Sequence, residues 1–113
     1  MGALAAGCEA ILSTDKDVVL PSQFVLYQNF PNPFNPVTNI YYDLPKSGHV
    51  RMVIYDLLGR EVTTLINETM KSGYYAKRWN GRNHYGQPVS AGIYFYHLQT
   101  DAYSKAHKML LVK

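Results

Sequence analysis

Apolar and polar side chains alternate over much of the chain from about residue 24 onward, and this alternation is typical of half-buried β-strands. The segments concerned are rich in β-branched and aromatic residues, which suit a pleated sheet surface. Two of the clearest segments carry their apolar side chains on one face: Ile40, Tyr42 and Leu44, then Val50, Met52 and Ile54. We predict strands at residues 24–27, 38–44, 49–56, 61–66, 74–79, 93–98 and 109–112.

Turn signals separate the predicted strands at intervals of roughly 8–12 residues. The predicted turns and loops cover residues 45–48, 57–60, 67–73 and 80–88. Gly59 stands where a tight turn most needs freedom in φ, and Gly81 and Gly86 bound the long turn after Trp79. The pattern predicts an all-β fold, an antiparallel β-sandwich of seven to eight strands, and no helix of ordinary length.

The C-terminal end is predicted to form a β-hairpin. Tyr94, Tyr96 and Leu98 share one strand face, and residues 100–102 are polar enough to form the turn. The apolar residues 109–112 then return as the last strand. Chain termini fray unless they are tied into a sheet, so we expect an ordered final strand that runs to the end of the sequence.

A proline-rich segment, residues 28–37, follows the first predicted strand. Its three prolines exclude a helix and remove backbone donors from a sheet ladder. We expect a rigid, extended connection with Phe30 and Phe34 as apolar anchors. The alternative is that the segment is a ligand for a proline-recognition domain.

The length of 113 residues supports one domain. We assign residues 23–113 to that domain and interpret residues 1–22, which have no clear periodicity, as a linker or the tail of a preceding domain. Trp79 is the predicted centre of the core. The ten tyrosines favour β-structure and could serve an interaction face.

Composition argues against several classes of function. The net charge of +3 is spread without a basic block, which disfavours nucleic-acid binding. No run of about 18 apolar residues is present to span a membrane. Cys8 is the single cysteine, so no intrachain disulfide can form. The four histidines lie in four separate segments without metal-ligand spacing, and we predict a protein that is not an enzyme and needs no metal or cofactor.

Two further kinds of site are compatible with the sequence. Residues 80–86 could wrap a calcium ion through their oxygens, although the loop has no carboxylate and its asparagines are expected to support turn geometry instead. Outward-facing tyrosines could also present a flat aromatic strip to a carbohydrate. The candidates for that strip are Tyr41, Tyr55, Tyr74 and Tyr103.

Six motifs in order then carry a resemblance to a known family. They are Phe30–Ile40 (FPNPFNPVTNI), Ile54–Val62 (IYDLLGREV), Trp79–Asn83 (WNGRN), Gly86–Val89 (GQPV), Ala91–Tyr96 (AGIYFY) and Lys108–Lys113 (KMLLVK). Together they resemble the type A C-terminal sorting domain of type IX secretion cargo from the Bacteroidetes. That family is similar to the immunoglobulin-like domain of the flagellar hook capping protein, so the resemblance implies an immunoglobulin-like sandwich.

The resemblance implies a non-catalytic targeting module at the end of a secreted protein. Its implied partners are the outer-membrane translocon with its shuttle protein, a sortase-like peptidase that cuts in the linker before Phe24, and an N-terminal cargo domain. The cargo would pass through the periplasm and be secreted or held at the cell surface. By position, the sorting signal comprises Gly92, Tyr94, Lys108, Met109 and Lys113. The structural motif comprises Pro31, Asn32, Pro33, Gly59, Trp79, Gly81 and Gly86.

Two other hypotheses use the same fold. One is a structural or assembly module of the hook-cap type, in which the terminal residues would be dispensable and surface patches would matter. The other is a carbohydrate-binding module that uses the exposed tyrosines. The leading hypothesis differs from both because it assigns the function to the last strand.

Overall fold

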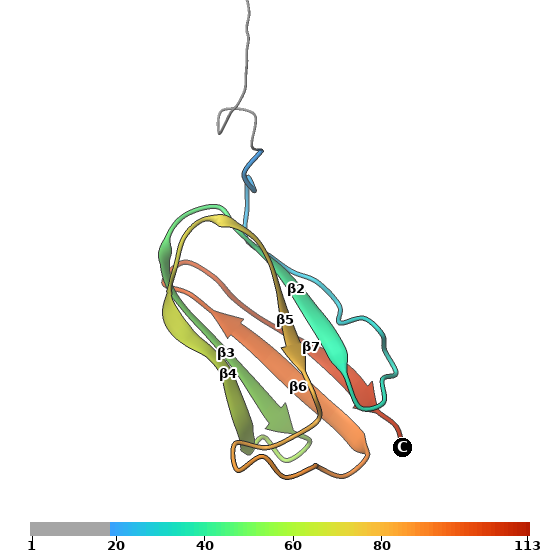
Figure 1. Cartoon of the computed structure of the whole chain (residues 1–113). Coiled ribbons are helices and arrows are strands. Elements are labelled where there is room, and N and C mark those ends of the chain that lie inside the picture. Colours follow the sequence, from blue (N-terminus) through green and yellow to red (C-terminus); the bar gives the residue numbers. More distant parts are fainter. Residues whose placement is uncertain (1–18) are drawn as a thin grey trace, which may run out of the picture.

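A computed structural model describes residues 19–113, and in this range the chain forms seven β-strands and no α-helix. The strands are β1 (Val25–Leu26), β2 (Thr38–Leu44), β3 (Gly48–Asp56), β4 (Glu61–Met70), β5 (Gly73–Trp79), β6 (Gly92–Gln99) and β7 (Ser104–Leu111). They form a three-stranded sheet, β1-β2-β5, and a four-stranded sheet, β4-β3-β6-β7. All strand pairs are antiparallel, and Figure 1 shows the two sheets as facing layers. The predicted all-β sandwich is therefore confirmed.

Several predicted strand boundaries are wrong. The last strand, predicted at residues 109–112 and expected to run to the end of the sequence, is β7, which begins at Ser104 and ends at Leu111. Residues 67–73 were expected to be a loop, but β4 continues to Met70, which pairs with Gly48 of β3. β4 is an edge strand, and its side chains at Asn67, Glu68 and Thr69 are exposed. A strand end that is polar on both faces has the composition of a loop, although its backbone hydrogen bonds continue. The first strand is also shorter than the predicted 24–27.

The predicted inward faces form the core between the sheets. The alternating apolar residues of β2, β3 and β6 are buried: Ile40, Tyr42, Leu44, Val50, Met52, Ile54, Tyr94, Tyr96 and Leu98. Trp79, only 1% exposed, packs at ring-centroid distances of 5.7 Å from Phe34 and 5.5 Å from Tyr94. The indole Nε1 donates a hydrogen bond of 2.9 Å to the Arg82 carbonyl oxygen, so burial leaves no polar atom of this side chain without a partner.

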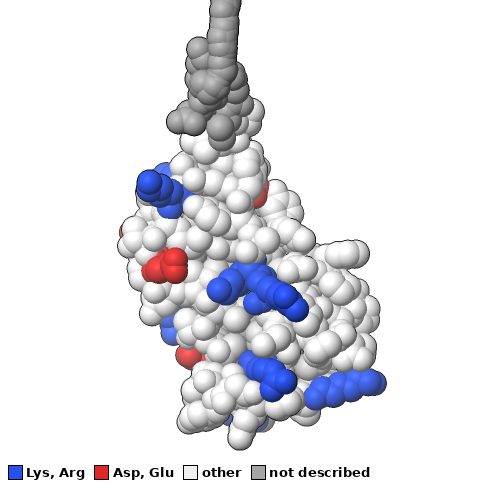
Figure 2. All heavy atoms as spheres, in the orientation of Figure 1, with Lys and Arg blue, Asp and Glu red and all other residues white. Residues whose placement is uncertain are grey.

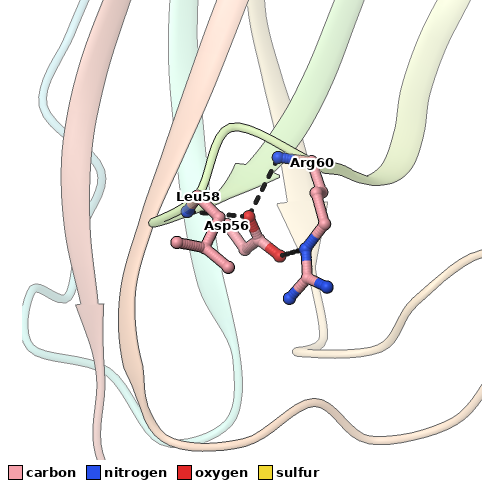
Figure 3. A network of polar contacts seen from close by, with 3 residues as sticks. All are labelled: Asp56, Leu58 and Arg60. Carbon is pink, nitrogen blue, oxygen red and sulfur yellow. Dashed lines mark hydrogen bonds and ion pairs between the residues drawn. The ribbon is translucent and has the colours of Figure 1, made fainter.

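The turn between β3 and β4 is held by the carboxylate of Asp56 (Figure 3). Its Oδ1 accepts hydrogen bonds from the backbone amides of Leu58 and Arg60, and its Oδ2 accepts one from Arg60 Nε, all at 2.9 Å. The Arg60 amide contributes most to lowering the pKa of Asp56 below its ordinary value. Gly59 has a φ of 83°, a conformation that a residue with a Cβ rarely adopts, which explains the glycine predicted at this turn.

The loop between β5 and β6 is a second rigid turn. Asn83 Oδ1 accepts hydrogen bonds from the amides of Tyr85 and Gln87, both at 3.0 Å, and the Gly86 amide bonds to the Asn83 carbonyl. Asn83 thus supports turn geometry, as expected from the sequence. A Cβ on Gly81 would lie 3.1 Å from the Pro36 carbonyl oxygen, and its φ of 73° also favours glycine.

The chain enters the sandwich at one end and finishes at the other (Figure 1). The β3–β4 turn, the β5–β6 loop and the C-terminus lie together at the end away from the entry of the chain. The point where the chain enters the sandwich and the C-terminus are therefore separated by the length of the strands.

Candidate functional site

The terminal strand β7 lies against the proline-rich segment. One edge of β7 pairs with β6, and β7 is the last strand of its sheet. Along the other edge, the Phe34 amide donates to the Leu110 carbonyl at 3.0 Å, and the Val112 amide donates to the Phe34 carbonyl at 2.9 Å. Phe34 and Leu111 accordingly form a parallel bridge. The segment that contains the prolines thus supplies hydrogen-bond partners for the open edge of the final strand.

Side chains complete this cover. Asn32 Oδ1 accepts a hydrogen bond of 3.0 Å from the Leu110 amide, and Gln28 Nε2 donates one of 2.7 Å to the Lys108 carbonyl. An exposed strand edge can pair with other chains, and these contacts occupy backbone groups of Lys108, Leu110 and Val112 at the C-terminal end of that edge. We call the residues Lys108–Lys113, together with Gln28, Asn32 and Phe34, the terminal-strand site.

The residues predicted as the sorting signal are brought together but differ in exposure. Gly92 pairs with Leu111 and Tyr94 with Met109 across the β6–β7 ladder. Tyr94 and Met109 point into the core, at 5% and 1% exposure, and Tyr94 Oη donates to the Ser90 carbonyl at 2.6 Å. Lys108 and Lys113 are exposed. The side chains of Tyr94 and Met109 therefore stabilise the fold and cannot contact a partner directly, whereas the side chains of the two lysines are accessible.

The proline motif has a defined place beside the strand. The Pro31 carbonyl accepts hydrogen bonds from Thr38 Oγ1 at 2.8 Å and from Asn29 Nδ2 at 3.1 Å, while Pro33 is exposed. Phe34 is buried against Trp79, as expected. The prediction for Phe30 is wrong, because its side chain is 71% exposed. Its backbone is fixed by hydrogen bonds to Asn39 at the edge of β2, so the ring stays outside the sandwich.

Sequence reasoning missed the exposed apolar residues beside the predicted lysine. Ile93 pairs with Leu110 on the outer face of the sheet, and Phe95 pairs with Lys108. Leu110 and Val112 are 38% and 41% exposed. Asn32, Ile93 and Lys108 help line a hollow of about 210 Å³ at this place. The alternation of the sequence contained the information needed to find these residues, because a residue between the inward Met109 and Leu111 must face outward.

The predicted tyrosine strip does not form on one face. Tyr41 and Tyr74 are exposed on the outer face of the three-stranded sheet. Tyr55 belongs to β3 of the other sheet and is only partly exposed. Tyr103 stacks on Phe24 at a centroid distance of 5.4 Å and is also partly buried. The outward prediction is confirmed for Tyr41 and Tyr74 and wrong for Tyr103, which packs against the core. Alternation also did not predict which strands share a sheet.

Within residues 19–113, no group of three or more His, Cys, Asp or Glu side chains is arranged to hold a metal ion. The same range contains no helix long and apolar enough to cross a membrane. Cys8 and most of the predicted linker lie outside the described residues.

Replacing Asn32 with alanine should loosen the cover of β7. The Leu110 amide would lose its protein acceptor, and a neutral hydrogen bond contributes about 0.5–1.5 kcal/mol to stability. We expect a loss within that range by urea unfolding and faster hydrogen exchange at the Leu110 amide. Asn35→Ala, at an exposed position of the same segment, is the control. Unchanged exchange at Leu110 in the Asn32 variant would contradict the assigned contact.

Comparison with known proteins agrees with this architecture. Crystal structures with similar folds include dimeric latent PorU from Porphyromonas gingivalis, with a TM-score of 0.64 and 19% identity over 91% of this chain and 10% of that chain. PorZ, a bacterial surface component of the type IX secretion system of the same organism, has a TM-score of 0.54 and 21% identity over 78% of this chain and 11% of that chain. FlgD from P. aeruginosa has a TM-score of 0.52 and 20% identity over 82% of this chain and 74% of that chain.

These structural matches establish the fold, and the chain spans only about a tenth of the length of PorU and PorZ. No curated protein matches the chain in sequence. The family described as "Secretion system C-terminal sorting domain" matches residues 28–113, which include every strand from β2 to β7. The chain therefore belongs to the secretion system C-terminal sorting domain family, the sorting signals of type IX secretion.

Proposed function

We propose that the type IX machinery recognises this domain through the outward side chains of the terminal-strand site. The family membership makes the domain a sorting signal that directs export to the cell surface or secretion. The observation that carries the finer proposal is the arrangement of β7. Its inward residues belong to the core, while Lys108, Leu110, Val112 and Lys113 remain available to a partner.

The rigidity of the site supports recognition of the folded domain. β7 is bonded to β6 on one edge and to residues 28–34 on the other. A partner that binds these exposed side chains would not have to order them from a flexible tail. Preorganisation of this kind lowers the entropic cost of binding.

The charge of β7 indicates the kind of surface that would bind it. Neither Lys108 nor Lys113 forms an ion pair with an acidic side chain of residues 19–113, where the two ion pairs join Arg51 to Glu61 and Arg60 to Asp56. We infer a partner surface with carboxylates next to an apolar patch that receives Leu110. The translocon and its shuttle protein are the proposed partners, reached from the periplasm, and the domain itself is proposed to be non-catalytic.

The position of chain entry supports a separate proposal about processing. A sortase-like peptidase that cut before Phe24 would act at the end of the sandwich away from the C-terminus (Figure 1). Cleavage there would separate an N-terminal cargo from residues 23–113 without breaking any strand of the sandwich. The proposed domain therefore comprises residues 23–113, and residues 1–22 are the proposed linker.

Charge reversal at Lys108 tests the recognition proposal. A reporter carrying the full chain at its C-terminus is expressed in a host with the type IX system. We expect Lys108→Glu to reduce the amount of reporter outside the outer membrane by about tenfold, because loss of one charged contact and its replacement by repulsion costs about 1.4 kcal/mol or more. Lys71→Glu, at an exposed position of the β4–β5 turn, is the matched control.

The thermal midpoint of both variants is measured in parallel to separate recognition from folding. Lys108 is exposed, so its reversal should leave the domain folded. A second variant, Leu110→Ser, removes the apolar side chain next to Lys108. If Lys108→Glu and Leu110→Ser are each exported normally, recognition through this face is refuted. The family assignment would still stand, and the secretion machinery would have to bind a different surface of the domain.

A further inference from the structure

A larger hollow lies away from the terminal-strand site, on the side of the sandwich where β4 and the β5–β6 loop meet the end of β5. Its volume is about 510 Å³, within the range of roughly 300–1,000 Å³ typical of small-molecule sites. We call it the basic cleft. Its polar lining consists of Thr63, Arg78, Asn80, Arg82, Asn83 and His84.

The charge of the basic cleft is one-sided. Two arginines line it and no carboxylate does. Both ion pairs found within residues 19–113 use other arginines, so Arg78 and Arg82 are not neutralised by an acidic side chain of that range. Figure 2 shows basic side chains over β5 and the loop that follows it, with the visible acidic side chains set apart from them. A positive potential without a protein counter-charge favours an anion.

The loop that carries half of this lining is fixed before any ligand binds. The Arg82 carbonyl accepts the hydrogen bond from Trp79 Nε1 at 2.9 Å, and Arg82 Nη1 donates to the Gly86 carbonyl at 2.8 Å. The backbone amide of His84 donates to the Val62 carbonyl at 3.2 Å, which ties the loop to β4. One donor of the Arg82 guanidinium is thus used in the loop, and four remain.

We propose that the basic cleft binds a phosphate group carried by a small, hydroxyl-rich molecule, such as a sugar phosphate. Guanidinium groups donate paired hydrogen bonds that match phosphate oxygens. Asn80, the Nδ2 of Asn83 and the Thr63 hydroxyl offer neutral donors and acceptors of the kind that sugar hydroxyls need. The proposal is independent of the sorting function, because the cleft shares no residue with the terminal-strand site.

Titration of the full chain with three compounds tests this assignment. We expect glucose 6-phosphate to bind about tenfold more tightly than inorganic phosphate, since added hydrogen bonds are each worth on the order of 1 kcal/mol, and glucose to bind too weakly to measure. Chemical-shift changes should appear at Asn80, Asn83 and His84. If neither glucose 6-phosphate nor inorganic phosphate binds, the proposal is overturned. If the two bind with equal affinity, the assignment of the hydroxyl contacts is overturned.

Two variants distinguish the cleft from general surface charge. Arg78→Gln should weaken binding of glucose 6-phosphate by about tenfold or more, and Lys71→Gln, which removes an exposed charge elsewhere, should not. Asn80→Asp should also weaken binding, because it places a carboxylate of the same size in the cleft. Undiminished affinity in Arg78→Gln and Asn80→Asp, with both variants folded, would contradict the location of the site.

Discussion

Replacing Trp79 with alanine should destabilise the domain by about 3–5 kcal/mol, the usual cost of removing a large buried aromatic side chain. Trp79 is 1% exposed and packs between Phe34 and Tyr94. The change would leave a cavity in the core and would remove the Nε1 hydrogen bond to the Arg82 carbonyl. Because domains of this size are stable by about 5–15 kcal/mol, this single substitution could unfold the protein.

Urea unfolding of the purified chain, followed by tyrosine fluorescence and circular dichroism, measures the effect. Tyr85→Ala provides a matched aromatic control, since Tyr85 is 76% exposed in the neighbouring loop and its loss should cost less than about 0.5 kcal/mol. A loss below about 2 kcal/mol for Trp79→Ala would mean that the core collapses around the site or that the indole contributes little.

The position of Trp79 also shows why the core could be predicted from the sequence. Alternation determines which side chains share a face, and it correctly placed Ile40, Met52 and Ile54 inside. Alternation failed at Glu68, whose backbone belongs to the edge strand β4 but whose exposed, polar side chain led to its prediction as part of a loop. Burial drives the pattern that sequence analysis detects, and an edge strand buries too little to produce it.

The candidate site was predictable only in part for a related reason. The resemblance to the family identified Asn32 and Lys108 as members of two motifs far apart in the chain. Periodicity does not determine which strands are neighbours, so the contact between the proline-rich segment and β7 could not be foreseen. Phe30 and Phe34 illustrate the limit, since two similar residues in one segment lie on opposite sides of the boundary between core and solvent.

Removing Lys108–Lys113 should abolish both folding and export. The deletion takes Met109 and Leu111 from the core, where each is 1% exposed, and comparable truncations of single apolar side chains cost about 2–5 kcal/mol. It also removes the hydrogen bonds that Leu110 makes with Phe34 and Asn32. The combined loss approaches the whole stability of such a domain, so failed export of this variant alone would not prove that the strand is a signal.

Removing only Val112 and Lys113 separates the two effects. Both residues are exposed, and the deletion takes away one hydrogen bond of the cover, from the Val112 amide to the Phe34 carbonyl. We expect a stability loss of about 1 kcal/mol, which leaves the domain folded, together with a fall in reporter export of tenfold or more if the terminal residues are recognised. Export and urea unfolding are measured on the same variant. If the folded variant is exported normally, recognition is restricted to Lys108 and Leu110. If the folded variant is not exported, the machinery must recognise the last two residues themselves, because the core of the variant is complete.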